Sequence, residues 1–183
     1  MTAKTAELNP HGPQLRKVVA NILTDAVWVH GTFHVPERQA LMDYFSGGVQ
    51  LLKTTRVRFP GEKELIPFLA FRRDALTLIE PSTDNDMVEA PGSIGRTTPH
   101  RVSAFLLVGQ LHGTLEVLVN VRVSDFLRQQ TNLLVLRSCV LLPYGEEPGS
   151  PKARRMRVVI LNVAKLLGVA EPVPSSLNQA PLP

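Results

Sequence analysis

The feature that most constrains the fold of this chain is an internal repeat. Residues 30–33 read His-Gly-Thr-Phe and residues 112–115 read His-Gly-Thr-Leu. An aspartate followed by an aromatic residue stands at the same distance beyond each glycine, at Asp43 and at Asp125. Matches that recur in one order at a near-constant offset indicate a structural unit that is present twice.

Further matches extend the repeat on both sides of the aspartates. An arginine precedes each aspartate, a Leu-rich stretch follows it, and each copy closes on Glu-Pro at 80–81 and at 171–172. Short polar side chains at such positions commonly hydrogen-bond the local backbone. We therefore expect the two segments to build the same structural turn, in which each arginine lies near its aspartate. The turn is formed in the two copies by Gly31, Arg38 and Asp43 and by Gly113, Arg122 and Asp125.

The apolar residues indicate a β fold. They make up 44% of the chain but aromatic residues only 5%, so the core must consist mainly of Val, Leu and Ile in short runs, which suits strands. A glycine inside a strand commonly marks a bulge or a sharp bend. The sequence predicts a mainly β protein, built as two tandem small five-stranded sheets that are strongly bent or form partly open barrels, related by internal duplication.

The domain boundaries follow from composition. Residues 82–99 are rich in Pro, Gly, Ser, Thr and Asp and show almost no apolar periodicity, which is typical of a linker. Residues 15–23 fit a short helix or a strand. The predicted order is an N-terminal lead or short helix (1–19), a first β domain (20–81), a mobile linker (82–99), a second β domain (100–172) and a flexible tail (173–183).

The bent second strand, the turn aspartate and the Leu-rich third strand together resemble the Sm-like small β-barrel. The box Arg122–Leu127 is also similar to an uncharacterised bacterial Sm-like family, and the resemblance covers residues 20–81 and 100–172. RNA-binding members carry an asparagine soon after the aspartate and an Arg-Gly pair beside strand four. Here 46–48 holds no asparagine, and neither 72–74 nor 162–164 holds that pair. The resemblance therefore implies the barrel more strongly than the RNA pocket.

No catalytic, cofactor or metal motif is recognised. Asp43 and Asp125 lack the Asp-Thr/Ser-Gly triplet of an aspartic-protease dyad. No cysteine or carboxylate joins His30, His34 and His112 at a metal-ligand spacing. The glycines of 46–48 are not followed by the Lys-Ser/Thr of a phosphate-binding loop. We expect a non-enzymatic protein without cofactor or metal.

The basic residues are the candidate binding surface. Lys and Arg number 20 against 16 Asp and Glu, a net charge of +4, which permits an anionic partner without requiring one. The interleaved aromatic residues that single-strand binders use for stacking are missing. The candidate partner-binding residues are Lys152, Arg154, Arg155 and Arg157, joined by Arg72 and Arg73 from the first copy.

The remaining features predict the compartment and the kind of partner. The single cysteine, Cys139, stands in an apolar stretch and is expected to be a buried thiol in a reducing compartment. The polar N-terminal segment and the lack of a membrane-length apolar run favour a cytoplasmic protein that does not bind membranes. The preferred hypothesis is a protein-interaction scaffold or adaptor, whose exposed strand edges can pair with a protein partner or, in a homo-oligomer, with copies of the chain. The alternative is an Sm-like nucleic-acid-binding protein.

Overall fold

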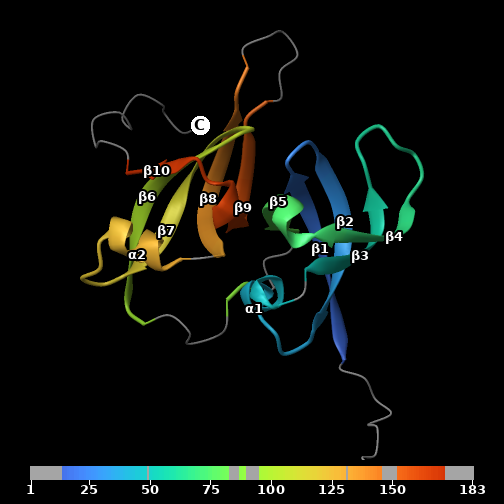
Figure 1. The fold of residues 1–183 in the computed structure, drawn as a ribbon, viewed down its shortest axis with the longest axis horizontal. Coiled ribbons are helices and arrows are strands. Elements are labelled where there is room, and N and C mark those ends of the chain that lie inside the picture. Colours follow the sequence, from blue (N-terminus) through green and yellow to red (C-terminus); the bar gives the residue numbers. More distant parts are fainter. Residues whose placement is uncertain are drawn as a thin grey trace, which may run out of the picture.

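The computed structural model describes residues 14–48, 50–82, 87–89, 95–130, 132–145 and 152–171. Over these residues the strands form one open antiparallel sheet of ten strands, in the order β10-β6-β7-β8-β9-β5-β1-β2-β3-β4 (Figure 1). The strands are β1 (Leu15–Thr24), β2 (Trp28–Pro36), β3 (Leu51–Arg58), β4 (Ile66–Arg72), β5 (Leu76–Pro81), β6 (Thr97–Leu106), β7 (Gly109–Leu118), β8 (Leu133–Pro143), β9 (Arg154–Asn162) and β10 (Gly168–Ala170). The prediction of a mainly β protein is confirmed.

The sheet consists of two sets of strands with the same pairing. The N-terminal set, β1–β5, is ordered β5-β1-β2-β3-β4, and the C-terminal set, β6–β10, is ordered β10-β6-β7-β8-β9. Pairing of β5 with β9 joins the sets. The two sheets expected from the sequence are thus parts of one continuous sheet, whose end strands β4 and β10 lie on opposite sides of the molecule in Figure 1.

Short helices occupy matching places in the two sets. Helix α1 (Leu41–Ser46) follows β2 and helix α2 (Val123–Gln129) follows β7, while the 3-10 turns η1 (Arg73–Ala75) and η2 (Val163–Lys165) precede β5 and β10. Within the described residues, no helix has the length and apolar character needed to cross a membrane.

Strand β1 shows why the N-terminal segment is extended. Val18, Ala20 and Ile22 are buried at every second position, and this period of two belongs to a strand and not to a helix. The strand alternative for residues 15–23 is therefore correct, and β1 begins at Leu15, before the predicted boundary at residue 20. The second set likewise begins early, at Thr97 instead of residue 100.

The two repeated glycines lie at bulges. The β2–β3 register shifts between His30 and Thr32, and the β7–β8 register shifts between His112 and Thr114. Each bulge also contains one non-glycine residue with positive φ on the neighbouring strand, Arg56 at 53° and Ser138 at 51°. The expected bulge is therefore present at each glycine, and its extra residue lies on the neighbouring strand, β3 or β8.

The middle of the sheet is buried on both faces because it serves two hydrophobic cores. The N-terminal core takes in Leu133, Val135 and Ile160 from the C-terminal set. The C-terminal core in turn takes in Leu23 and Leu78 from the N-terminal set. Each set of strands therefore completes the core of the other.

Polar contacts reinforce the β5–β9 joint at both ends. The Nδ2 group of Asn162 donates a hydrogen bond of 2.9 Å to the carbonyl of Leu76. At the other end of β9, the Arg154 guanidinium pairs with the Glu80 carboxylate and lies 4.0 Å from the centroid of the Trp28 ring. These partners come from different sets, so the contacts fix the relative position of the two.

Part of the predicted linker is packed against the N-terminal set. The carbonyls of Met87 and Val88 accept hydrogen bonds of 2.8 and 3.0 Å from the backbone amides of Leu41 and Met42. Because the first amides of a helix have no partner inside it, this segment supplies acceptors to the start of α1. Val88 is also buried in the N-terminal core, so the prediction of a mobile 82–99 linker is wrong at this point. Residues 83–86 and 90–94, and the predicted tail 173–183, lie outside the described residues.

Candidate functional site

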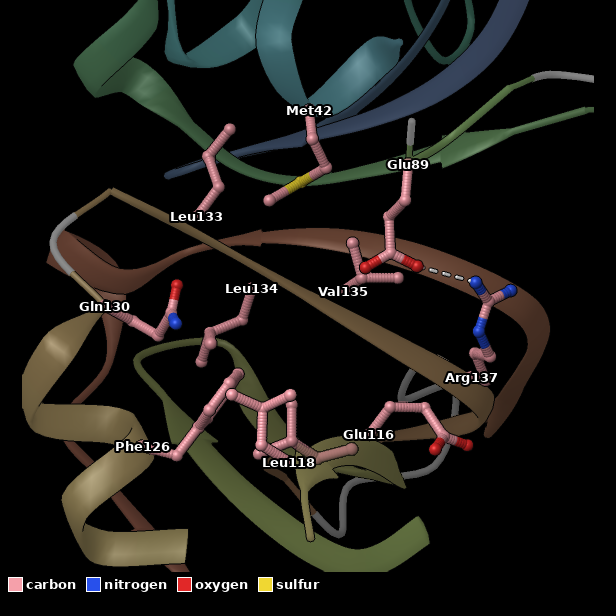
Figure 2. Close-up of a pocket in the computed structure, with 11 residues that line it drawn as sticks. Met42, Glu89, Glu116, Leu118, Phe126, Gln130, Leu133, Leu134, Val135 and Arg137 are labelled. Carbon is pink, nitrogen blue, oxygen red and sulfur yellow. Dashed lines mark hydrogen bonds and ion pairs between the residues drawn. The ribbon is translucent and has the colours of Figure 1, made fainter. Parts of the chain in front are cut away.

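A pocket of about 220 Å³ lies where the N-terminal set, the linker and the C-terminal set meet (Figure 2). Met42 and Glu89 stand on one side of it, and Phe126 and Leu118 stand on the other. The rest of the lining comes mainly from β7 and β8. The walls are largely apolar, so the interior suits an apolar group.

The charged groups of this pocket already have partners. Arg137 Nη2 donates a hydrogen bond of 2.7 Å to Glu89 Oε2, which ties the linker to β8 (Figure 2). The Oε2 atom of Glu116 accepts a hydrogen bond of 2.8 Å from the hydroxyl of Thr97. Paired charges of this kind position the walls, and they leave the pocket as a site for binding an apolar group.

The six candidate basic residues do not form one face. The Nδ2 group of Asn162 approaches the carbonyl of Arg73 at 3.5 Å, so Arg73 lies beside the C-terminal end of β9. Lys152 and Arg155 are exposed near the other end of this strand. Since a strand rises about 3.3 Å per residue, the two groups are roughly 25 Å apart along β9.

Several of these basic side chains are committed to internal contacts. The Nη1 group of Arg73 donates hydrogen bonds of 3.2 and 2.6 Å to the carbonyls of Ser46 and Gly47 at the end of α1. Arg154 holds Glu80 and Trp28 as described above. Arg72 pairs with Asp74, and this hydrogen bond lowers the pKa of the Asp74 carboxyl. Of the six candidates, Lys152, Arg155 and Arg157 are exposed at and just before the start of β9, and they are called the basic surface below.

The Gly-to-Asp segments end in helices and not in simple turns. Asp43 and Asp125 both stand in the first helical turn, at α1 and at α2, where a negative charge favours the helix. Asp125 contacts Arg128 at 3.6 Å, and the predicted partner Arg122 is instead the residue that precedes the helix. Arg38 and Asp43 are both exposed, and the described contacts include no ion pair between them. The expected arginine–aspartate pairs are thus not formed.

The histidines are held by hydrogen bonds in the sheet. His30 Nδ1 lies 3.1 Å from Asn21 Oδ1, and His112 Nδ1 lies 2.8 Å from the Ser103 hydroxyl, each across the same strand pair of its set. His34 Nε2 lies 2.8 Å from the hydroxyl of Thr55. Across the described ranges, His, Cys, Asp and Glu side chains form no group of three that could hold a metal ion.

Cys139 is buried, as the sequence predicted. Burial, with a smaller contribution from the Glu80 carboxylate, raises the pKa of its thiol to about 12. The thiol stays protonated near neutral pH, whereas a cysteine in the unfolded chain ionises near ~8.5. Between these two values the folded state binds more protons than the unfolded state. The contribution of this residue to stability therefore falls as pH rises from about 9 towards 12.

We expect Cys139 to resist alkylation in the folded protein. Only the thiolate reacts, and the native thiol is both protonated and covered. Iodoacetamide at pH 8.5, followed by mass spectrometry, should label the denatured chain rapidly and the native chain only as fast as it unfolds. Equal labelling rates with and without denaturant would show that the β8 strand opens locally.

The sequence predicted exposed strand edges but did not identify β4 as one of them. β4 is an end strand, and it exposes Ile66 and Phe68, the latter with 56% of its surface accessible. Leu51 on the neighbouring β3 is 52% exposed. Pro67 could have indicated this edge from the sequence, because proline in a strand is confined to positions that need no ladder hydrogen bond.

No protein-family model, no curated protein and no solved structure matches this chain.

Proposed function

We propose that the chain is a non-enzymatic protein-interaction module, acting as a scaffold or adaptor in the cytoplasm, that binds a protein strand at the β4 edge. The observation that carries this proposal is the exposure of apolar side chains on an end strand of the sheet. Ile66 and Phe68 are exposed, and among the described residues only β3 pairs with β4, so the other side of β4 is free. Such an edge offers backbone donors and acceptors for an added strand.

We also infer that the two sets of strands are copies of one duplicated domain of the small Sm-like type. The repeated order of strands, helix and 3-10 turn supports the inference. The bulges that contain Arg56 and Ser138 support it further, because two copies of one domain are expected to share the same irregularity at the same place. Under this inference the β5–β9 joint is an interface between two domains.

Binding of nucleic acid is the second candidate function, and the exposed Lys152, Arg155 and Arg157 support it. These residues would contact phosphates, and binding would weaken steeply with salt. The engagement of Arg73 and Arg154 in internal contacts favours the protein partner over nucleic acid.

Site-specific photocross-linking in the native cell tests the proposed function. A photoreactive residue is placed at Phe68 on the β4 edge, at Arg155 on the basic surface, or at the exposed Arg101 of β6 as a control. We expect a protein adduct at Phe68 that is resistant to nuclease and absent from the control. The same adduct should disappear when Ile66 is changed to Lys, because a charged residue blocks strand addition at an edge.

The pattern of adducts separates the two functions. A nuclease-sensitive adduct at Arg155, with none at Phe68, would replace the proposed function by nucleic-acid binding. Adducts equally strong at all three positions would show that the β4 edge is not a specific surface.

A further inference from the structure

The joint between the two sets is more than a strand pairing. Only Leu78–Leu161 and Ile79–Ile160 are paired across β5 and β9. The groove between α1 and β5, beside Phe45 and Ile79, is filled by Leu133 and Ile160 of the C-terminal set, leaving a cavity of about 10 Å³. The joint therefore consists of a short β5–β9 pairing and of apolar side chains of the C-terminal set that fill a groove of the N-terminal set.

The counterpart of this groove in the C-terminal set lies between α2 and β10. Leu127 stands two residues after the first-turn aspartate of α2, as Phe45 does in α1. Val169 lies opposite Ala104 of β6, as Ile79 lies opposite Ile22 of β1. In the described structure this second groove is open, with a volume of about 370 Å³. Val123, Leu127 and Val169 form its apolar lining, and Ser124, Arg128 and Glu171 form its polar lining.

The counterparts of the two groove-filling side chains are Leu51, which is exposed, and Ala70, which is half-buried. Leu51 lies opposite Arg72, the last residue of β4, as Leu133 lies opposite Asn162, the last residue of β9. Phe68 lies opposite Thr55 as Val158 lies opposite Arg137, and Val158 packs against the N-terminal core. One end of the sheet therefore exposes the side chains that such a joint uses, and the other end carries the unfilled groove.

We propose that copies of this chain associate head to tail. β4 of one copy adds to β10 of the next, Leu51 enters the groove between α2 and β10, and Phe68 packs beside it. This proposal rests on the proposed function, because it names a second copy of the chain as the partner of the β4 edge. A second copy of the chain fits the β4 edge because the β5–β9 joint already pairs the corresponding strands, with β9 in the place of β4 and β5 in the place of β10.

The existing joint also sets the register. If the new interface repeats the β5–β9 register, Val169 takes the place of Ile79 and Ala70 takes the place of Ile160, so these two lie opposite each other. In the same way Gly168 lies opposite Phe71, as Leu78 lies opposite Leu161. Because the two surfaces are different, the contact is heterologous and produces a closed ring or a filament.

Light scattering and sedimentation over a concentration series test the assembly. The wild-type chain should form species larger than a dimer. Leu51→Asp removes the β4-side contact and Ser124→Trp fills the α2 groove, so each variant alone should be monomeric. Both residues are exposed, and thermal unfolding should be unchanged. Leu142→Asp, at an exposed leucine of β8, is the matched control and should assemble like wild type.

Mixing the two variants gives the decisive result. Each variant retains the surface that the other lacks, so an equimolar mixture should form a one-to-one dimer and nothing larger. A disulfide between Ala70→Cys and Val169→Cys chains, absent with Leu69→Cys, should confirm the register.

Three outcomes would overturn the head-to-tail proposal: a monomeric wild type at every concentration, unchanged assembly of Leu51→Asp, or dimers of Ser124→Trp alone, which would indicate β4–β4 pairing. A monomeric chain that still gives a Phe68 protein adduct in cells would discard self-assembly and keep the proposed function. A chain that neither assembles nor gives a Phe68 adduct would rule out the head-to-tail proposal and the proposed function together.

Discussion

Ile160→Ala should lower the free energy of unfolding by about 2–5 kcal/mol, the usual range for truncating a buried isoleucine. The side chain is 1% exposed and belongs to the core of the N-terminal set, although its strand, β9, belongs to the C-terminal set. Because the two cores share strands, the loss should lower the stability of the whole sheet in one cooperative transition. Denaturant titration followed by circular dichroism and by Trp28 fluorescence measures this.

Leu142→Ala is the matched control for that variant. It removes the same number of carbon atoms from an exposed position, since Leu142 is 40% exposed, so the expected loss is about 1 kcal/mol or less. Two separate unfolding transitions, with only one shifted by Ile160→Ala, would contradict the shared core and show that the two sets fold independently.

Gly31→Ala should destabilise the protein by about 1–3 kcal/mol, the usual range for overpacking a filled core. A Cβ at this position would lie 2.6 Å from Cγ2 of Thr54, which is itself fully buried and has no free space to move into. Thermal and denaturant unfolding would measure the loss. Gly48→Ala is the control, because no atom lies within 4 Å of a Cβ there, and it should be nearly neutral.

A double-mutant cycle tests the cause of the Gly31 effect. Thr54→Ser removes the Cγ2 methyl that the new Cβ would meet, so the double variant should be more stable than the sum of the two single changes by about 0.5–3 kcal/mol. Strict additivity of Gly31→Ala and Thr54→Ser would show that the strain arises elsewhere in the bulge.

Part of the local structure was predictable from the sequence. The bulges at Gly31 and Gly113 follow from the missing Cβ, which is a property of a short segment. Residues 15–23 fitted a helix or a strand, and only their alternating burial in the sheet identifies β1 as a strand. The arginine–aspartate pairs were not formed, because Asp43 and Asp125 enter helices, and helical geometry places Arg128, three residues on, beside Asp125. Spacing along the chain does not determine which charges meet.

The candidate surfaces were harder to predict because they depend on distant pairing. Nothing local in β5 or β9 indicates that Ile79 will lie opposite Ile160, and this pairing decides which edges stay free. It also engages Arg154, so a residue assigned to the binding surface became part of the joint. The Glu-Pro ends of the two copies are also out of register by one residue. Asn21 of β1 and Ser103 of β6 occupy equivalent positions, but Glu80 lies opposite Asn21 whereas Ala170, and not Glu171, lies opposite Ser103.

The shared core also sets an order of events during synthesis. The N-terminal strands leave the ribosome before Leu133, Val135 and Ile160 have been synthesised. Until then the apolar groove of the N-terminal set remains exposed to water. Contacts this distant in sequence form slowly, because a long loop must close before they stabilise the chain. A polypeptide stalled before β9 would thus expose the surface that the finished protein hides, and we expect a chaperone to bind the nascent chain in this interval.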